Sequence, residues 1–400
     1  MRAPIRFWLA FVVTVIVTNE LCAQGFLIST VRTGMVFDHA GQNLYIADGD
    51  GLIKTFNLST RTFQRTYNLG GWLWGIDIAP DDSFIVAAQA SYTLFPPQAT
   101  FQRVNLASGA ITNINYIPDS AGSWDIKIAS NGLALATAHF AGSGWTWLRQ
   151  IDLSTNAITI RSDAPGSGAG GQVRGDTQIY RSADGTRLLF MESDISSGPT
   201  FTYSANTNTF GPSFSTNAFR DWAGGAVNRN GNLVAVTTGY YGTQTSLYTA
   251  PSFHDISDFN GLESGLAFDG VRDILYGVNT ATDQIVAYST PTFAELFRLA
   301  IGEAIGPPPI TQFDTGTLVA STDGHWLALE TDSGIRLFDV ANPPIAVPPN
   351  PRAVVADFNG DGHPDLVARN VATQQTGILY LNNNVVIGVA LAPLSAVVGR

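Results

Sequence analysis

Short apolar runs alternate with small polar turns along most of this chain, and the unit they form returns seven times. In its clearest copy the sequence reads Trp124-Asp-Ile-Lys-Ile-Ala-Ser-Asn-Gly-Leu-Ala-Leu-Ala, an apolar strand, an Asn-Gly turn and a second apolar strand. Asn-Gly and Asp-Gly adopt the positive φ that tight hairpins require, so each copy predicts a strand-turn-strand unit. The matching strands begin 41 to 53 residues apart, at Met35, Ile76, Ile126, Ile179, Gly225, Leu266 and Leu318.

Most copies continue with a third and a fourth short strand. In the first copy these are residues 53–58 and 62–67. Four short strands at this period are typical of a β-propeller blade, and blades must close around an axis because none buries its faces alone. The sequence therefore predicts an all-β fold whose main domain is a seven-bladed β-propeller.

The two ends of the repeat region supply a test of ring closure. The last copy has three strands, near 317–322, 326–331 and 334–340, while a lone apolar strand, 26–31, precedes the first copy. If that N-terminal strand completes the last blade, the ring has no open sheet edge. We therefore expect the propeller to span 24–342 and to be closed by this strand.

The first 23 residues are typical of a secretory signal. Arg2 and Arg6 precede an apolar run, 7–17, that is short for a membrane span, and Leu21-Cys-Ala23 offers suitable residues for cleavage after Ala23. Cys22 invites a lipoprotein interpretation, but the residues before it are not small. Cys22 is the one cysteine of the chain and leaves with the signal, so the mature protein is expected to lack disulfides. The signal itself predicts that the protein is secreted, periplasmic or on the cell surface.

Composition and charge limit the classes of partner that the protein is expected to bind. Charged residues make up 13% of the chain and the formal net charge is −11, which disfavours nucleic acid because phosphates are repelled. The five histidines do not pair at metal-ligand spacing, and no hydrolase nucleophile elbow is present. Protein, peptide or glycan ligands remain as the expected partners, with no integral membrane span.

Two glycine-rich strings have structural interpretations. Residues 166–171 match G-x-G-x-x-G, but they follow Asp163-Ala-Pro and precede no predicted helix, so a loop between blades is favoured over a nucleotide site. Asp48-Gly-Asp-Gly51 lies where the first blade needs the turn between its second and third strands.

Aromatic residues mark one face of the predicted ring. Trp74, Trp124 and Trp222 fall at or just before the starts of inner strands. The loops between second and third strands, which reach the same face, add His139-Phe140, Tyr240-Tyr241 and Gln89. Such groups on one concave face suit a sugar, peptide or flat organic ligand. The alternative is that the tryptophans pack between blades as core.

A proline-dense run, residues 343–351, predicts an extended spacer and a domain boundary. Beyond it, within 352–400, the sequence reads Asp357-Phe-Asn-Gly-Asp-Gly-His-Pro-Asp365. Side-chain oxygens at alternating positions of a tight loop select Ca²⁺, whereas the alternative is a plain hairpin with solvated carboxylates. The candidate ligands are Asp357, Asn359, Asp361, the carbonyl of His363, and Asp365.

The C-terminal segment resembles one unit of the FG-GAP/VCBS repeats of bacterial surface proteins and integrin-type propellers. The resemblance rests on residues 357–365 and on Gly377-Ile-Leu-Tyr-Leu-Asn-Asn-Asn384, and it implies calcium binding by the loop residues named above. Residues 26–342 are similar to the broad YVTN/WD-type seven-bladed propellers, with no sharp shared motif.

Two functions of different classes follow from these patterns. The first is an exported, calcium-stabilised binding or adhesion protein that uses the propeller face. The second is a hydrolase of lactonase type acting at the channel mouth, a chemistry found among similar propellers. For the second, Asp125, Arg220 and Asp221 are the ionisable residues best placed, and they make a thin constellation for catalysis.

Overall fold

The computed structural model describes residues 25–95, 97–119, 121–140, 144–192, 198–215, 224–238, 244–306, 311–341, 358, 365–369, 376–382 and 385–391. The chain divides into two compact units, Met1–Pro343 and Pro344–Arg400, and each is described by itself. No helix among these residues is long and apolar enough to cross a bilayer.

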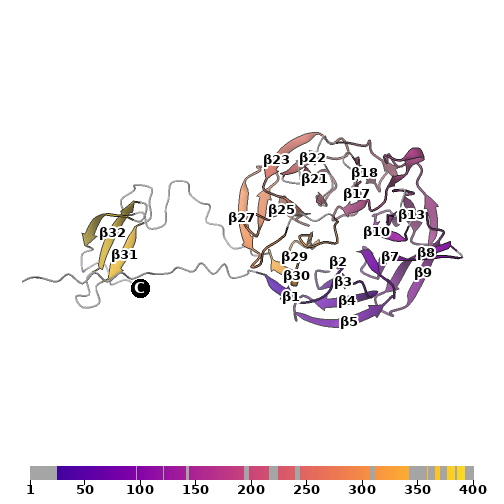
Figure 1. Cartoon of the computed structure of the whole chain (residues 1–400), viewed down its shortest axis with the longest axis horizontal. Helices are drawn as coiled ribbons and strands as arrows, with labels where there is room; N and C mark the ends of the chain where they lie inside the picture. The colour runs from indigo at the N-terminus through magenta and orange to yellow at the C-terminus, as the bar shows by residue number, and fades with distance from the viewer. Residues whose placement is uncertain are drawn as a thin grey trace, which may run out of the picture. The chain divides into compact units, whose positions relative to one another are not determined.

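The first unit is a ring of seven antiparallel four-stranded sheets, which confirms the predicted seven-bladed propeller (Figure 1). In the first six blades the strands follow one another in chain order from the axis outward, and in the seventh the outermost strand comes from the start of the chain. Blades 1 to 4 are formed by β2(Gly34–Phe37), β3(Asn43–Ala47), β4(Leu52–Asn57) and β5(Thr62–Asn68); β6(Leu73–Ile78), β7(Phe84–Leu94), β8(Pro97–Asn105) and β9(Ile111–Tyr116); β10(Ser123–Ile128), β11(Leu133–Ala138), β13(Arg149–Asp152) and β14(Ala157–Ile160); and β16(Gln178–Arg181), β17(Arg187–Met191), β18(Thr200–Ser204) and β19(Thr209–Phe210).

The remaining blades complete the circle. They are formed by β20(Gly225–Val227), β21(Leu233–Thr238), β22(Gln244–Thr249) and β23(Asp255–Asn260); β24(Ser264–Phe268), β25(Ile274–Asn279), β26(Gln284–Ser289) and β27(Glu295–Ala300); and β28(Leu318–Ala320), β29(Trp326–Thr331), β30(Gly334–Asp339) and β1(Phe26–Ile28). The hairpins predicted from Asn-Gly and Asp-Gly form where expected, with Gly132 and Gly185 at φ +79° and +67°. A residue with a Cβ is strained at such φ values, which is why glycine occupies these turns.

Ring closure depends on the N-terminal strand. β1 pairs antiparallel with β30, with Phe26 opposite Leu337 and Ile28 opposite Ile335. The strand from the start of the ring thus becomes the outermost strand of the last blade, as predicted. Gly334 permits the close approach, since an added Cβ there would lie 2.2 Å from the carbonyl oxygen of Ile28.

The hydrophobic core lies between neighbouring blades rather than within them. One cluster joins Val36 and Tyr45 of blade 1 to Ile76 and Ile85 of blade 2. Another joins Ile335 of blade 7 to residues of blade 1, and similar clusters unite blades 2 with 3, 3 with 4, 4 with 5 and 5 with 6. Blades 1 to 5 therefore each bury apolar residues against two different neighbours.

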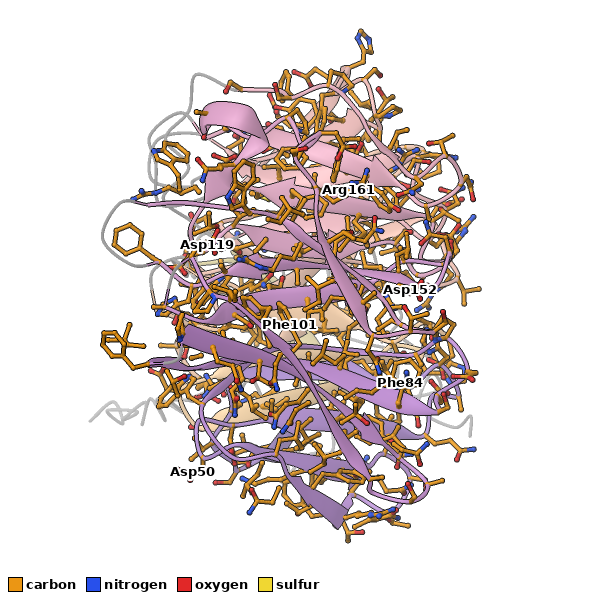
Figure 2. The ribbon with its side chains drawn as sticks, turned by 90° about the vertical axis from the view of Figure 1, so that its right-hand side faces the viewer. Asp50, Phe84, Phe101, Asp119, Asp152 and Arg161 are labelled. Atoms are coloured by element: carbon orange, nitrogen blue, oxygen red, sulfur yellow. The ribbon has the colours of Figure 1, made fainter. Side chains whose placement is uncertain are left out.

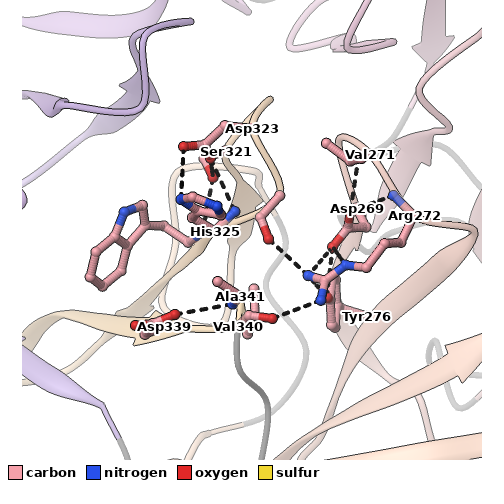
Figure 3. A network of polar contacts seen from close by, with 12 residues as sticks. Asp269, Val271, Arg272, Tyr276, Ser321, Asp323, His325, Asp339, Val340 and Ala341 are labelled. Atoms are coloured by element: carbon pink, nitrogen blue, oxygen red, sulfur yellow. Dashed lines mark hydrogen bonds and ion pairs between the residues drawn. The ribbon is translucent and has the colours of Figure 1, made fainter.

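A polar network joins blades 6 and 7 (Figure 3). The Arg272 guanidinium pairs with Asp269 and donates hydrogen bonds to the carbonyls of Gly324 and Val340, each at 2.8 Å. Tyr276 donates to Asp269 at 2.9 Å. Burial opposes ionisation of Asp269, but the hydrogen bonds from Arg272 and the backbone outweigh it, and the pKa of Asp269 is lowered. The network thereby holds Val340, which directly follows β30 at the end of the ring.

Blade 2 differs from the sequence prediction. Its second and third strands, β7 and β8, extend to Leu94 and start at Pro97, so they project as a long hairpin. Gln89, which we expected in the connecting loop, lies inside β7 opposite Leu73. The Asp48–Gly51 segment is the predicted turn between β3 and β4, in which the Asp48 carboxylate accepts from Asp50 N, Leu52 N and Lys54 Nζ.

Between blades 3 and 4 the chain adds a short ribbon, β12(Trp145–Thr146) paired with β15(Val173–Arg174). The glycine-rich string 166–171 lies between these blades, as predicted, and contains the three-residue 3-10 helix η1(Ala169–Gly171). The second unit contains β31(Leu366–Arg369), β32(Thr376–Asn382) and β33(Val385–Leu391), which form a three-stranded antiparallel sheet.

The closing strand yields the first prediction. Ile28 is 2% exposed and belongs to the cluster between blades 7 and 1, whereas its neighbour Leu27 is 37% exposed. We expect Ile28→Ala to lower the free energy of unfolding by about 2–5 kcal/mol, because it removes buried methyl groups and leaves a cavity. Leu27→Ala, the matched control, should cost less than about 1 kcal/mol. Urea unfolding measures both, and equal losses would contradict the closure role of Ile28.

Candidate functional site

The propeller has two ends with different chemistry. We call the end formed by the loops that lead into inner strands, and by the loops between second and third strands, the loop face. The other end, formed by the hairpins between first and second strands, is the turn face. Figure 2 shows Asp50, from the turn between β3 and β4, and Asp119, from the loop before β10, toward one face of the ring, and Asp152 and Phe84 toward the opposite face.

Four aromatic side chains meet at the loop face over the propeller axis. Trp74 and Trp124 lie near the starts of β6 and β10, and their ring centroids are 4.7 Å apart. His139 follows β11 and stacks on Trp124 at 5.0 Å with an interplanar angle of 7°. Phe313, far away in sequence, stacks on Trp74 at 5.4 Å. We call Trp74, Trp124, His139 and Phe313 the aromatic cluster.

The members of the aromatic cluster differ in burial. Trp124 is 2% exposed and acts as core, whereas Trp74 is half-buried and the side chain of His139 is 32% exposed. Trp72, which is 47% exposed, extends the cluster outward at 5.4 Å from Trp74. The inner part of the cluster therefore packs between blades, while its outer part is available at the surface.

Polar groups at the cluster are unevenly satisfied. His139 is held by Asp176, with Nδ1 and Oδ1 2.7 Å apart, and the same Oδ1 accepts from Phe140 N at 2.8 Å. The indole nitrogens of Trp74 and Trp124 are buried and donate no hydrogen bond. A buried N–H without an acceptor is uncommon, so the cluster retains unused donor capacity.

Further apolar residues that sequence reasoning missed lie on the loop face of blades 1 to 3. They belong to the loops before β2, β6 and β10 and to the tip of the β7–β8 hairpin, and their exposed fractions run from 47% to 94%: Val31, Trp72, Leu94, Phe95 and Ile117. Only the length of the hairpin, which the turn signals did not reveal, places two of them here. Exposed apolar residues gathered on one face are typical of interaction surfaces.

Beneath the aromatic cluster lies a buried charged layer centred on Asp125. Its Oδ1 accepts from Ile126 N at 2.8 Å and lies 3.2 Å from Lys127 Nζ. Its Oδ2 accepts from Ile179 N of blade 4 at 2.9 Å and from the side-chain amide of Gln312. Both carboxylate oxygens of Asp125 therefore already accept hydrogen bonds, and these bonds join blades 3 and 4 to the segment that contains Phe313.

Asp77 makes the equivalent link one blade earlier. Its Oδ2 accepts from Ile128 N at 2.7 Å and lies 3.2 Å from Arg181 Nη1. Gly75 leaves room for this layer, since an added Cβ there would lie 2.1 Å from Asp125 Oδ1. Sequence reasoning placed Asp125 at an inner strand, but the partners Gln312 and Phe313 have no motif that would have identified them.

Several predicted site residues lie outside the described residues. In the propeller these are Trp222, Tyr240, Tyr241, Arg220 and Asp221. In the second unit they are Asp357, Asn359, Asp361 and His363. Their roles therefore stay predictions.

Asp365 is the one predicted calcium ligand that lies among the described residues. It is 7% exposed, and its two oxygens accept from different parts of the chain: Oδ2 from Phe358 N at 2.7 Å and Oδ1 from Leu381 N at 3.0 Å. The first bond draws the beginning and end of the loop together, and the second ties the loop to β32. Asp365 thus positions the loop on the sheet.

Comparison with known proteins agrees with the fold. Residues 350–381 match the model of the FG-GAP repeat, which confirms the resemblance seen in the sequence. No curated protein matches the chain. Among solved structures, one titled Kuenenia stuttgartiensis hydrazine synthase matches with a TM-score of 0.56 and 11% identity, over 80% of this chain and 99% of that one. At this identity the likeness concerns the fold alone.

The protein is therefore a seven-bladed β-propeller followed by an FG-GAP repeat, an architecture consistent with a binding or adhesion role. The similarity of the propeller to the YVTN group stays a prediction.

The charged layer yields the second prediction. Asp125→Ala should lower the free energy of unfolding by about 3–5 kcal/mol, because it leaves the Lys127 ammonium without its carboxylate. Asp50→Ala removes an exposed carboxylate on the same face and should change it by less than about 0.5 kcal/mol. Chemical denaturation of both variants gives these values. A wild-type stability for Asp125→Ala would contradict the assigned role.

Proposed function

We propose that this chain is an exported binding or adhesion protein that holds its ligand on the loop face of the propeller. The observation that carries the proposal is the aromatic cluster at the axis, continued outward by exposed apolar side chains on the loops of blades 1 to 3. Aromatic faces beside unused indole donors suit a sugar ring, a peptide or a flat organic molecule.

The state of Asp125 favours binding over hydrolysis. A general base or nucleophile needs a lone pair directed at the substrate. The Asp125 side chain is fully buried, and its oxygens already accept hydrogen bonds from two blades and from Gln312. We therefore keep the hydrolase only as the alternative, with Arg220 and Asp221 as its remaining candidates.

Calcium is the second part of the proposal. Asp357, Asn359, Asp361 and Asp365 provide hard oxygen donors at alternating positions, and the carbonyl of His363 adds another. The contacts of Asp365 support this fit, because its carboxylate links Phe358, near the start of the loop, to Leu381 of β32. Bound calcium would neutralise the converging carboxylates and stabilise the second unit.

Export is the third part. It rests on Arg2, Arg6, the apolar run 7–17 and the small residue Ala23. The calcium-binding role fits that location, because extracellular modules bind calcium with the modest affinity that millimolar calcium outside cells permits.

The ligand proposal predicts that Trp72→Ala and Trp74→Ala weaken binding by about tenfold or more, because exposed tryptophans dominate the energy of such interfaces. The ligand is to be found by screening the full chain on glycan and peptide arrays in calcium, and its Kd measured by calorimetry. Ile160→Ser, on the outer strand β14 and 53% exposed, is the control and should bind as the wild type. Unchanged Kd values for both tryptophan variants would refute the loop face as the site.

The calcium proposal predicts that calcium raises the midpoint of a thermal transition of the secreted chain. At a hundredfold excess over Kd, the corresponding gain in the free energy of unfolding is up to about 2.7 kcal/mol. Chelator should remove the gain, and Asp361→Ala should lack it. Asp50→Ala is the control and should retain it. A calcium response identical in Asp361→Ala would show that the loop is a plain hairpin.

The intact mass of the secreted chain also reports whether cleavage follows Ala23.

A further inference from the structure

The most exposed large hydrophobic residues of the described propeller gather on the loop face. Val31, Leu94, Phe95 and Ile117 have exposed fractions from 63% to 94%, above those of the other large hydrophobic residues described in the ring. Leu94 ends β7 and Phe95 follows it. Ile117 directly follows β9, and Trp72, which is 47% exposed, directly precedes β6. We call Trp72, Leu94, Phe95 and Ile117 the blade 2 tip, and such a group of exposed apolar side chains is typical of an interaction site.

The end of the blade 2 tip stands out from the ring as a two-stranded hairpin. The ladder between β6 and β7 reaches no further than Gln89, and the ladder between β8 and β9 no further than Ala99. Beyond these positions β7 and β8 pair only with each other, up to Leu94 opposite Pro97. The exposed apolar groups are therefore carried on a convex projection. A projection of this kind cannot enclose a small ligand, but it can enter a soft apolar layer.

Two further exposed residues flank the base of this hairpin. The Trp72 carbonyl accepts a hydrogen bond from Ala90 N at 2.8 Å, which places the indole beside β7, and Ile117 lies on the side of β9. Membrane proteins concentrate tryptophan at the boundary between hydrocarbon and water, because its ring is apolar and its N–H is polar. The projection thus carries Leu94 and Phe95 at its end and an indole nearer the ring.

The hairpin carries no charge. Residues 83–102 contain no Asp, Glu, Lys, Arg or His. Near the base, Asp119 is paired with Arg149 at 2.7 Å. The exposed Asp50 follows Gly49, where an added Cβ would lie 2.8 Å from the Trp72 ring. Anionic lipid is attracted by clusters of Lys and Arg, so an uncharged projection beside an acidic residue is suited to neutral lipid instead.

The backbone of the hairpin is also suited to an apolar layer. Backbone polar groups that enter lipid must be hydrogen-bonded within the protein, because hydrocarbon offers no partner. The pairing of β7 with β8 meets this requirement as far as Leu94 and Pro97. The turn reads Leu94-Phe-Pro-Pro97, and its two prolines have no backbone N–H to remove from water. Insertion of this turn therefore costs less than insertion of a turn without proline.

We propose that the blade 2 tip inserts into the neutral surface of a lipid bilayer, with Leu94 and Phe95 in the outer part of the hydrocarbon. The contact is peripheral and holds the loop face against the membrane. A bilayer fits better than a protein partner, because the projection is convex and uncharged, whereas protein interfaces depend on Trp, Tyr and Arg set into pockets. The inference goes beyond the proposed function, which concerns a ligand at the aromatic cluster, and each can fail without the other.

The experiment is flotation of the full chain with vesicles of pure phosphatidylcholine, and with vesicles that also contain phosphatidylglycerol. We expect the chain to float with both kinds in proportion to the lipid added. High salt should not weaken the contact, because burial of hydrocarbon and not charge drives it. Absence of binding to pure phosphatidylcholine would overturn the proposal, and so would binding that requires phosphatidylglycerol.

Variants of the hairpin end test which residues insert. Leu94→Ser and Phe95→Ser should each lower the vesicle partition coefficient by about tenfold, because each removes a side chain that gains from leaving water. Phe95→Trp should retain binding, since tryptophan also suits the interface. Ile160→Ser, on the outer strand β14 and 53% exposed, is the matched control and should partition as the wild type. Equal partition coefficients for Phe95→Ser and Ile160→Ser would overturn the proposal.

A fluorophore separates insertion from contact with protein. In a Cys22→Ser background, an environment-sensitive dye on Phe95→Cys should shift to the blue with phosphatidylcholine vesicles and be quenched by nitroxide-labelled lipid, whereas the same dye on Ile160→Cys should do neither. Sedimentation velocity without lipid should give the same mass for the wild type and Phe95→Ser. An unchanged spectrum at residue 95 would overturn the proposal. A wild-type oligomer that Phe95→Ser dissociates would overturn it in favour of a second copy of the chain.

Discussion

Apolar contact between neighbouring blades is the interaction on which the rest of this protein depends. A four-stranded blade is too thin to bury its own side chains, so its two faces need two neighbours. The cluster between blades 7 and 1 can form only because β1 crosses from the start of the chain to the end of the ring. Without that pairing, β30 would present an open edge and the last blade would lose a wall of its core.

Ring closure creates a channel, and the chain uses its two sides differently. Asp77 and Asp125 accept backbone N–H groups from the next blade while they hold Arg181 and Lys127. Buried ion pairs of this kind add little net stability compared with apolar residues of similar size, but breaking one is costly. Their effect is to fix the alignment of blades 2 to 4, whereas Glu330 of blade 7 is buried beside Arg32, whose Nε lies 3.4 Å from its Oε2.

The two faces of the ring also differ in the groups that they carry. The chain begins β1 and ends β30 at the turn face, where Val340 N donates to His325 O at 2.7 Å and Arg272 holds the Val340 carbonyl. Both described ends of the propeller chain therefore lie at this face. The loop face is free of chain ends, and it carries the partly exposed aromatic residues Trp72, Trp74 and His139.

The sequence by itself determined the architecture. Asn-Gly and Asp-Gly turns between apolar runs fixed the strands, because those φ values and that alternation allow few other structures. Their period fixed the number of blades, and the three-stranded last copy with the lone strand before the first copy indicated closure of the ring by the N-terminal strand, which the pairing of β1 with β30 confirms. The FG-GAP repeat was evident from the acidic loop, since its residues are contiguous.

Only the tertiary structure decided which distant side chains meet. Nothing local to Gln312 or Phe313 shows that they cross the channel to Asp125 and Trp74, because that contact spans 187 residues between Gln312 and Asp125. The prediction that Gln89 lies in a loop was wrong for a related reason. The same sequence is compatible with a longer β7, and only the pairing with β8 decides where that strand ends. The burial of Glu330 likewise follows from ring closure, which brings β29 beside Arg32. Contacts between segments far apart depend on the whole ring, and sequence pattern carries only local information.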